Sequence, residues 1–236
     1  MKNNIIQKIR KELKSNIDLE YKKGSYRFFK EDIKLYGVRV PLVRKMSQKY
    51  FSEIKDLDKK KIISLCDELL KSGYTEESVI AFDWIYRIKN QYNKNDFKVF
   101  ESWVEKYVSN WGRCDDLCSH AFGYYIFQFP EFLPKTEKWT KSKNRWKRRV
   151  SAVCLIYSLR KKKYLENAFS VADILLEDSD DLVQKGYGWM LKEASNIYLD
   201  EVYSYVNKNK KKMPRTALRY AIEKMPKKMK TELMKK

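Results

Sequence analysis

A short pattern of residues occurs twice in this chain at helical spacing, and it restricts the fold more than any other feature. Val79-x-Ala-x-x-x-Ile-Tyr-x-x-Lys89 matches Val150-x-Ala-x-x-x-Ile-Tyr-x-x-Arg160, an offset of 71 residues (150 minus 79). Elsewhere apolar residues also recur at helical spacing, with short connections between the segments. Gly and Pro are scarce, at 7 and 5, which argues against a turn-rich β fold. The sequence therefore predicts a succession of short helices.

The offset also predicts how these helices are arranged. Two helical hairpins of roughly 35 residues each would produce it, a length typical of HEAT or armadillo repeats. We therefore expect an all-α, HEAT-like α-solenoid of antiparallel helix pairs, with one set of helices lining a concave basic groove. The whole chain, residues 1–236, would form a single repeat domain. A compact helical bundle fits the composition almost as well, and the repeat decides between the two.

Apolar periodicity and capping residues place the expected helices along the chain. Pro41 suits the first turn of one helix, and Gly73 suits the end of another. The C-terminal tail from Lys227 onward is expected to fray. The expected helices are Asn4–Leu19, 41–50, Lys59–Lys71, Thr75–Ile88, Asp96–Val108, Ala121–Phe129, Phe132–Lys141, Asn144–Lys162, Tyr164–Leu176, Asp181–Ala194, Asp200–Val206 and Thr216–Met225.

The charge balance predicts a polyanionic partner. Lys and Arg total 51 against 31 Asp and Glu, a net charge of +20. Such an excess usually indicates DNA, RNA or an anionic membrane face. The alternative is a lysine-rich proteome, in which Lys covers every surface. We expect the basic stretches 160–163 and 208–212 to be solvated loops at the rim of a DNA footprint.

The cysteines and the N-terminus indicate a cofactor-free protein of the cytoplasm. Cys66, Cys114, Cys118 and Cys154 lack the spacing of a disulfide framework, and Cys114-x3-Cys118 with His120 lacks that of a zinc site. We expect the four to be buried as small apolar residues. The first helix does not resemble a signal peptide, and no apolar run approaches membrane-spanning length. We expect a soluble monomer without metal.

The stretch from Ser109 to Gly123 carries the chemistry that most needs an explanation. It places Trp111 four residues before Asp115, and a helix that starts early enough would put both on one face. Asp115 and Asp116 are expected in the first turn, where they complement the positive end of the helix dipole. A carboxylate repels phosphate, so an acid kept within a basic surface suggests a role other than binding the DNA backbone.

Two further helix starts combine tryptophan with basic residues. They are Arg145-Trp146-Lys-Arg-Arg149 and Gln184-Lys-Gly-Tyr-Gly-Trp189. Helix N-termini with basic side chains are natural phosphate sites. Arg145 and Arg149 share a face, whereas Arg148 points elsewhere. Trp84, Trp103 and Trp139 lie inside apolar stripes and are expected in the core.

The three tryptophans of the helix starts differ in their surroundings. Trp146 fits the core and the groove equally well. Trp111 and Trp189 lie beside glycine and polar residues, so we expect them to be exposed. The glycines Gly112, Gly186 and Gly188 would allow a ligand to approach the backbone closely.

Four motifs follow one another along the chain: Gly37-Val-Arg-Val-Pro41-x2-Arg44, Trp111-x3-Asp115, Arg149 after Trp146, and Gln184-Lys185-x2-Gly188-Trp189-x2-Lys192. In this order and spacing, they resemble the AlkD-type DNA alkylation repair family. Each motif alone has low specificity, whereas four in register are specific. The resemblance covers nearly the whole chain.

The resemblance implies a DNA glycosylase that removes positively charged alkylated purines, such as N7-methylguanine and N3-methyladenine, from duplex DNA. Trp111, Asp115 and Trp189 would match catalytic cleft residues. Tyr26 would match a family tyrosine, although its spacing to Gly37 is stretched, and Lys192 stands where the family usually has Arg. The resemblance makes Arg149 a DNA contact. We expect other residues to bind DNA as well, namely Tyr26, Arg44, Arg145, Lys185 and Lys192.

The residue types suit this reaction. A cationic purine leaves without a general acid, so the enzyme must stabilise the positive charge that grows on the sugar and must supply a water. One carboxylate between two aromatic rings can do both. Two alternatives remain open. One is a non-catalytic nucleic-acid-binding protein with the same groove, and the other is a protein-interaction solenoid.

Overall fold

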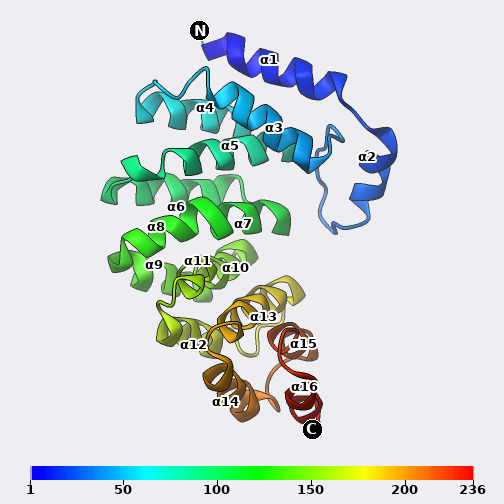
Figure 1. Ribbon diagram of the computed structural model, residues 1–236, viewed down its shortest axis with the longest axis vertical. Coiled ribbons are helices and arrows are strands. Elements are labelled where there is room, and N and C mark those ends of the chain that lie inside the picture. Colours follow the sequence, from blue (N-terminus) through cyan, green and yellow to red (C-terminus); the bar gives the residue numbers. More distant parts are fainter. Residues whose placement is uncertain (1, 236) are drawn as a thin grey trace. The chain divides into compact units, whose positions relative to one another are not determined.

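The computed structural model describes residues 2–235, and these residues are all-α, as the sequence predicts (Figure 1). The described residues contain no β-strand, and only a single parallel bridge joins Lys34 to Tyr74. The chain divides into two compact units. Unit 1 comprises the chain up to Asp96 together with Lys106–Asp116, and unit 2 comprises Phe97–Glu105 and the chain from Leu117 onward. The prediction of one repeat domain stays a prediction.

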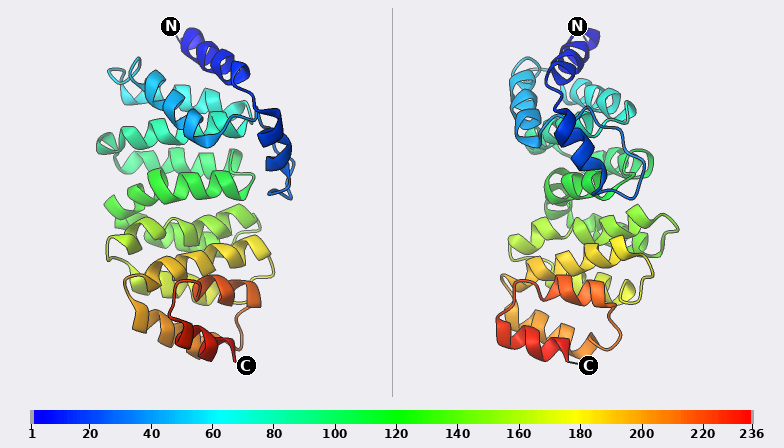
Figure 2. Two further views of the ribbon diagram at one scale, coloured as in Figure 1. Left: turned by 45° about the vertical axis from the view of Figure 1, so that its right-hand side comes forward. Right: turned by 90° about the vertical axis from the view of Figure 1, so that its right-hand side faces the viewer.

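Unit 1 is built around helix α5, which packs against α4 and α3 (Figure 2). Trp84 of α5 is fully buried, and its Nε1 donates to the carbonyl of Ser47 on α3 at 3.0 Å. The elements of unit 1 are α1 (Lys2–Ser15), α2 (Leu19–Tyr26), α3 (Val40–Phe51), α4 (Lys59–Lys71), α5 (Thr75–Arg87), the 3-10 turns η1 (Lys89–Gln91) and η2 (Lys94–Asp96), and most of α7 (Trp111–Leu117).

Unit 2 is built around helix α13, which packs against α10, α11, α12, α14 and α15. Its inward residues are fully buried, among them Val183, Tyr187 and Leu191. The elements of unit 2 are most of α6 (Phe97–Lys106), the π-helical segment η3 (Cys118–Phe122), α8 (Gly123–Gln128), η4 (Pro130–Phe132), α9 (Leu133–Lys138), η5 (Trp139–Lys141), α10 (Arg145–Val153), α11 (Ile156–Arg160), α12 (Leu165–Ile174), α13 (Asp181–Ser195), α14 (Leu199–Asn209), α15 (Arg215–Ala221) and α16 (Lys227–Met234).

The sequence repeat corresponds to equivalent packing in the two units. Ala81 and Ile85 of α5 are buried, as are their counterparts Ala152 and Ile156. The helix expected over Asn144–Lys162 is interrupted between α10 and α11. The side chain of Asn144 caps α10 by accepting the N–H of Trp146 at 2.9 Å. Small buried residues at matching positions let each repeated helix approach its neighbours closely.

The structure corrects the ends of the chain. The first helix stops at Ser15. Asp18 then caps α2, because its carboxylate accepts the N–H of Tyr21 at 2.9 Å. The C-terminal tail forms α16, which packs against α14 through the buried Leu233, so the expected fraying is wrong. A buried apolar side chain holds the tail although most of its residues are polar.

Two adjacent acids at the start of α5 anchor the segment before α3. The carboxylate of Glu76 accepts three backbone N–H groups, from Tyr36 at 3.1 Å, Gly37 at 2.7 Å and Val38 at 3.1 Å. Glu77 accepts the hydroxyl of Tyr36 at 2.7 Å and the guanidinium of Arg10 at 3.0 Å. Burial and the carboxylate of Glu77 both raise the pKa of the Tyr36 hydroxyl. Both acids are buried, so their hydrogen bonds offset the cost of desolvation.

Close helix packing in unit 2 depends on Gly188 of α13. A Cβ at this position would lie 2.7 Å from Cβ of Tyr220 and 2.8 Å from the carbonyl oxygen of Ala217, both on α15. These separations are shorter than van der Waals contact, so only glycine permits this approach of α13 to α15.

No described helix is both long and apolar enough to cross a membrane.

The carboxylate of Glu76 is predicted to be essential for stability. Glu76→Ala removes three charge-assisted hydrogen bonds and leaves buried N–H groups without partners, so it should lower the free energy of unfolding by about 3–4 kcal/mol. Glu53→Ala is the control, because Glu53 forms an exposed ion pair with Lys8 and should cost less than about 1 kcal/mol. Urea unfolding measures both, and equal losses would contradict the anchoring role.

Gly188→Ala should destabilise unit 2 by about 1–3 kcal/mol, because the added methyl group forces α15 away from α13. Gly24→Ala on α2 is a matched control, because its Cβ would have only Arg27 Nη2 nearby, at 3.8 Å. Alanine in that helix should be neutral or stabilising. Thermal unfolding distinguishes the two, and an unchanged melting temperature for Gly188→Ala would show that the packing tolerates a side chain there.

Candidate functional site

Trp111 and Asp115 lie on one face of α7, because the helix begins at Trp111 itself. Asn110 is buried, and its side-chain oxygen accepts the N–H of Arg113 at 3.0 Å, which starts the helix at this point. The expectation that Asp115 and Asp116 lie in the first turn is therefore wrong, because the cap is one residue before Trp111. The side chains of Trp111 and Asp115 are both partly exposed.

Trp111 is held in place by two aromatic residues that the sequence analysis did not assign to the site. Its Nε1 donates to the backbone carbonyl of Phe28 at 3.1 Å. Its ring stacks on Phe29, with the centroids 4.9 Å apart and the planes inclined by 12°. The side chain of Phe28 itself is 70% exposed. The aromatic and basic composition of residues 26–30 was the available signal.

Tyr26 is the last residue of α2 and has an exposed fraction of 42%. It belongs to the same short segment as Phe28 and Phe29. Its role as the family tyrosine stays a prediction.

Asp116, next to Asp115, forms an ion pair within unit 1. Its Oδ1 lies 2.5 Å from Nη2 of Arg44, and Asp83 lies 3.8 Å from Nη1 of the same guanidinium. Asp83 also accepts the hydroxyl of Ser47 at 2.5 Å. The charge of Arg44 is therefore compensated by two carboxylates of its own unit, and its contact with DNA stays a prediction.

The segment that follows α7 is π-helical over Cys118–Phe122. A Cβ at Gly123 would lie 2.3 Å from the carbonyl oxygen of Cys118, so a residue without a side chain is needed to end the wide turn. Single π-helical turns inside α-helices are frequent at functional sites.

All four cysteines are buried with free thiols, as expected, and burial raises the pKa of the Cys66 thiol. Among residues 2–235 no group of three or more His, Cys, Asp or Glu side chains is arranged to hold a metal ion.

In unit 2, Trp189 is partly exposed and lies one helical turn from an acid. Its Nε1 donates to Oε1 of Glu193 at 2.9 Å, and Glu193 also accepts from Arg160 at 2.9 Å. Burial favours a higher pKa for the Glu193 carboxyl, but the hydrogen bonds from Arg160 and Trp189 outweigh it and lower the pKa. Glu193 was not among the predicted site residues, although Trp189-x3-Glu193 has the same spacing as Trp111-x3-Asp115.

Three of the cations expected to bind DNA have acidic partners within unit 2. Arg145 Nε lies 3.0 Å from Asp180, Lys185 Nζ lies 3.1 Å from Asp181, and Lys192 Nζ lies 3.0 Å from Glu223. The charge of each is therefore partly offset before any phosphate approaches, and their DNA contacts stay predictions.

Arg149 is buried rather than displayed on an open surface, with an exposed fraction of 5%. Its guanidinium donates to the carbonyl of Leu182 on α13. Its Cγ would lie 3.0 Å from a Cβ at Gly186. Gly186 therefore makes room for Arg149, and Gly188 makes room for α15. The expectation that these glycines open the backbone to a ligand is wrong, because neighbouring helices fill the space.

The remaining tryptophans belong to the core. Trp146, which fitted the core and the groove equally well from the sequence, is only 8% exposed and belongs to the core. The other three, Trp84, Trp103 and Trp139, are buried as expected. Arg148 points elsewhere, as predicted, because it binds Asp178 through Nε at 2.7 Å.

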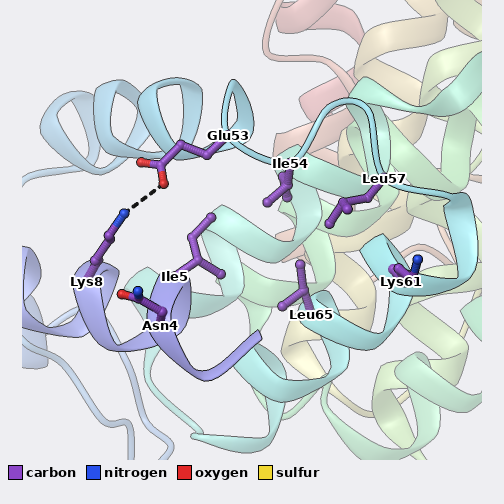
Figure 3. Close-up of a pocket in the computed structure, with 8 residues that line it drawn as sticks. All are labelled: Asn4, Ile5, Lys8, Glu53, Ile54, Leu57, Lys61 and Leu65. Atoms are coloured by element: carbon purple, nitrogen blue, oxygen red, sulfur yellow. Dashed lines mark hydrogen bonds and ion pairs between the residues drawn. The ribbon is translucent and has the colours of Figure 1, made fainter. Parts of the chain in front are cut away.

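A cavity of about 440 Å³ lies in unit 1 (Figure 3). Its walls are mainly apolar, and the ion pair between Lys8 and Glu53, at 2.9 Å, stands at its edge. The residues that line it are Asn4, Ile5, Lys8, Glu53, Ile54, Leu57, Lys61 and Leu65. None of the predicted site residues is among them.

Comparison with solved structures shows the same fold in two DNA repair proteins. A predicted DNA alkylation repair enzyme from Enterococcus faecalis superimposes with a TM-score of 0.73 at 17% identity, over 83% of this chain and 90% of that one. The alkylpurine DNA glycosylase AlkC of Pseudomonas fluorescens, bound to DNA with an abasic site analogue, gives a TM-score of 0.56 at 15% identity. That alignment covers 98% of this chain and 66% of AlkC.

A search of curated proteins finds no match to this chain. The model of the family described as DNA alkylation repair enzyme matches residues 9–225, nearly the entire chain. This match, together with the shared helical fold, shows that the chain belongs to the DNA alkylation repair enzyme family.

Proposed function

We propose that this protein is a DNA glycosylase that excises positively charged alkylated purines, such as N7-methylguanine and N3-methyladenine, from duplex DNA. The observation that carries the proposal is the pair of partly exposed side chains, Trp111 and Asp115, on one face of α7. Membership in the DNA alkylation repair enzyme family supports it. The DNA-bound state of the AlkC structure supports DNA as the partner.

The reaction breaks the bond between the sugar C1′ and the purine nitrogen. The electron pair leaves with the base, which becomes neutral because it carried a positive charge before cleavage. Positive charge develops on the sugar, and the carboxylate of Asp115 would stabilise it electrostatically. A water then adds to C1′ and passes its proton to that carboxylate or to solvent. The products are a free alkylated purine and an abasic site.

Trp111 would act as an aromatic wall for the cationic sugar and base. Trp111 suits this role because its hydrogen bond to Phe28 and its stacking on Phe29 fix the ring before substrate binds. Fixed groups need no reorganisation during the reaction, which is the source of their catalytic benefit. Within unit 2, Trp189 is held by its hydrogen bond to Glu193, and its catalytic role stays a prediction.

The adjacent acids have separate roles in this proposal. Asp116 pairs with Arg44 and stabilises unit 1, whereas Asp115 serves the reaction. This division gives the proposal a sharp internal control, because the two residues are neighbours of identical chemistry.

The protein should release N7-methylguanine from methylated duplex DNA in the presence of EDTA, because the proposed chemistry uses a carboxylate and no metal. Chromatography of the released bases measures the rate. Release at the spontaneous rate, with tight DNA binding retained, would exclude the enzyme and favour a non-catalytic DNA-binding protein. A protein that neither excises bases nor binds DNA would support the interaction solenoid.

Asp115→Asn should lower the single-turnover excision rate by about 100-fold or more, because it removes the charge that stabilises the sugar cation. Its affinity for DNA should change little. Asp116→Asn should lower the melting temperature, because it breaks the ion pair with Arg44, and its excision rate per folded molecule should stay within a few-fold of the wild-type rate. Similar losses of rate in the two variants would contradict the assignment of Asp115.

A further inference from the structure

The turn that follows α11 has an unusual backbone for its sequence. Lys162 and Tyr164 both have positive φ values, 59° and 66°. The N–H of Lys162 donates to the carbonyl of Leu159 at 2.9 Å, and the N–H of Lys163 donates to that of Ser158 at 3.0 Å. This pair of hydrogen bonds is the Schellman motif that ends many helices, with Lys162 in the left-handed position.

Glycine is the usual residue at that position, because an L side chain there crowds its own backbone. Lysine at this position therefore lowers stability. A left-handed residue with a side chain is uncommon and tends to persist where its side chain has a function. This chain places a lysine at the position where glycine would stabilise the turn.

The turn also concentrates positive charge that no acid offsets. Lys161, Lys162 and Lys163 are all exposed. Within the part of the chain that the structure describes, none of the three forms an ion pair. Arg145 and Lys192, in contrast, lie 3.0 Å from carboxylates. Unpaired cations attract phosphate more strongly than cations that already have an acidic partner.

An aromatic cluster holds the turn in a fixed position. Tyr124, Phe127 and Tyr157 pack against each other with ring centroids 5.6–6.5 Å apart. Lys163 Nζ lies 4.9 Å from the centroid of Phe127, and the hydroxyl of Tyr164 donates to the carbonyl of Phe127 at 3.5 Å. The lysines therefore extend from a braced turn at the end of α11.

We propose that Lys161, Lys162 and Lys163 form a binding site for the phosphate backbone of duplex DNA. The choice of DNA rests on the proposed function, and the site itself rests on the backbone and charge of the turn. It is separate from the cations of the family motifs, each of which has an acidic or carbonyl partner within its own unit. The lysines would add affinity without contacting the reacting sugar.

The first test compares two double variants by their affinity for an undamaged duplex over a range of salt concentrations. Lys161→Ala/Lys163→Ala should bind about tenfold more weakly at physiological salt, and the slope of log affinity against log salt should fall by about 1–2. Lys98→Ala/Lys138→Ala removes the same charge from exposed positions of α6 and α9 and should have a much smaller effect. Equal effects of the two pairs would overturn the proposal.

The second test uses Lys162→Gly, which removes the side chain and relieves the backbone. Its melting temperature should rise by about 2–4 °C, while its affinity for the duplex falls severalfold. A rise in stability with unchanged affinity would show that Lys162 has no part in binding and would overturn its assignment.

Undamaged duplex separates this proposal from the glycosylase proposal, because binding is measured without any excision. If excision fails and the lysine dependence remains, the phosphate site stands. Vesicles containing anionic lipid are the competing partner. If the lysine substitutions weaken binding to the vesicles but leave binding to DNA unchanged, the DNA site is overturned in favour of a membrane surface.

Discussion

The hydrogen bonds from three backbone N–H groups to Glu76 are the interaction on which the candidate site of unit 1 depends. They fix the backbone at Gly37, whose carbonyl accepts the N–H of Asp18 at 2.9 Å. Asp18 in turn caps α2, and the segment after α2 carries the Phe28 carbonyl that holds Trp111. A buried acid at the start of one helix thus fixes the orientation of an indole on another. Because α2 buries no residue of its own, these polar contacts rather than a core position it.

The attraction of a basic side chain for phosphate depends on its local partners as well as on the net charge of the chain. The chain has a net charge of +20, yet cations expected to bind DNA, such as Arg44, Arg145 and Lys192, have carboxylates within hydrogen-bonding distance. An ion pair keeps a long side chain in a defined position but reduces its attraction for phosphate. Lys161, Lys162 and Lys163 differ from these cations, because they are exposed and form no ion pair within the described part of the chain. We infer that the cations in ion pairs position the DNA, whereas the lysines of the turn 161–163 attract its phosphates.

The sequence predicted helices best where capping and periodicity agree. The bounds of Lys59–Lys71 were predicted correctly, because Asp58 caps the start and Gly73 has the positive φ, 77°, that ends the helix. Prediction failed at the C-terminus, because a few buried contacts such as that of Leu233 decide whether a polar tail folds. The burial of Arg149 was not predicted either, and its contact with DNA stays a prediction. Burial depends on neighbours that are distant in the chain.

The sequence alone determined the all-α class, the family motifs and the pairing of Trp111 with Asp115, because helical periodicity and i, i+4 spacing are local properties. Only the tertiary structure showed that Phe29 stacks on Trp111 and that helix α15 occupies the space beside Gly188. A glycine beside a tryptophan can make room for a ligand or for another helix, and the local sequence is the same in both cases. The distinction arises from contacts between segments far apart in the chain, which no local pattern encodes.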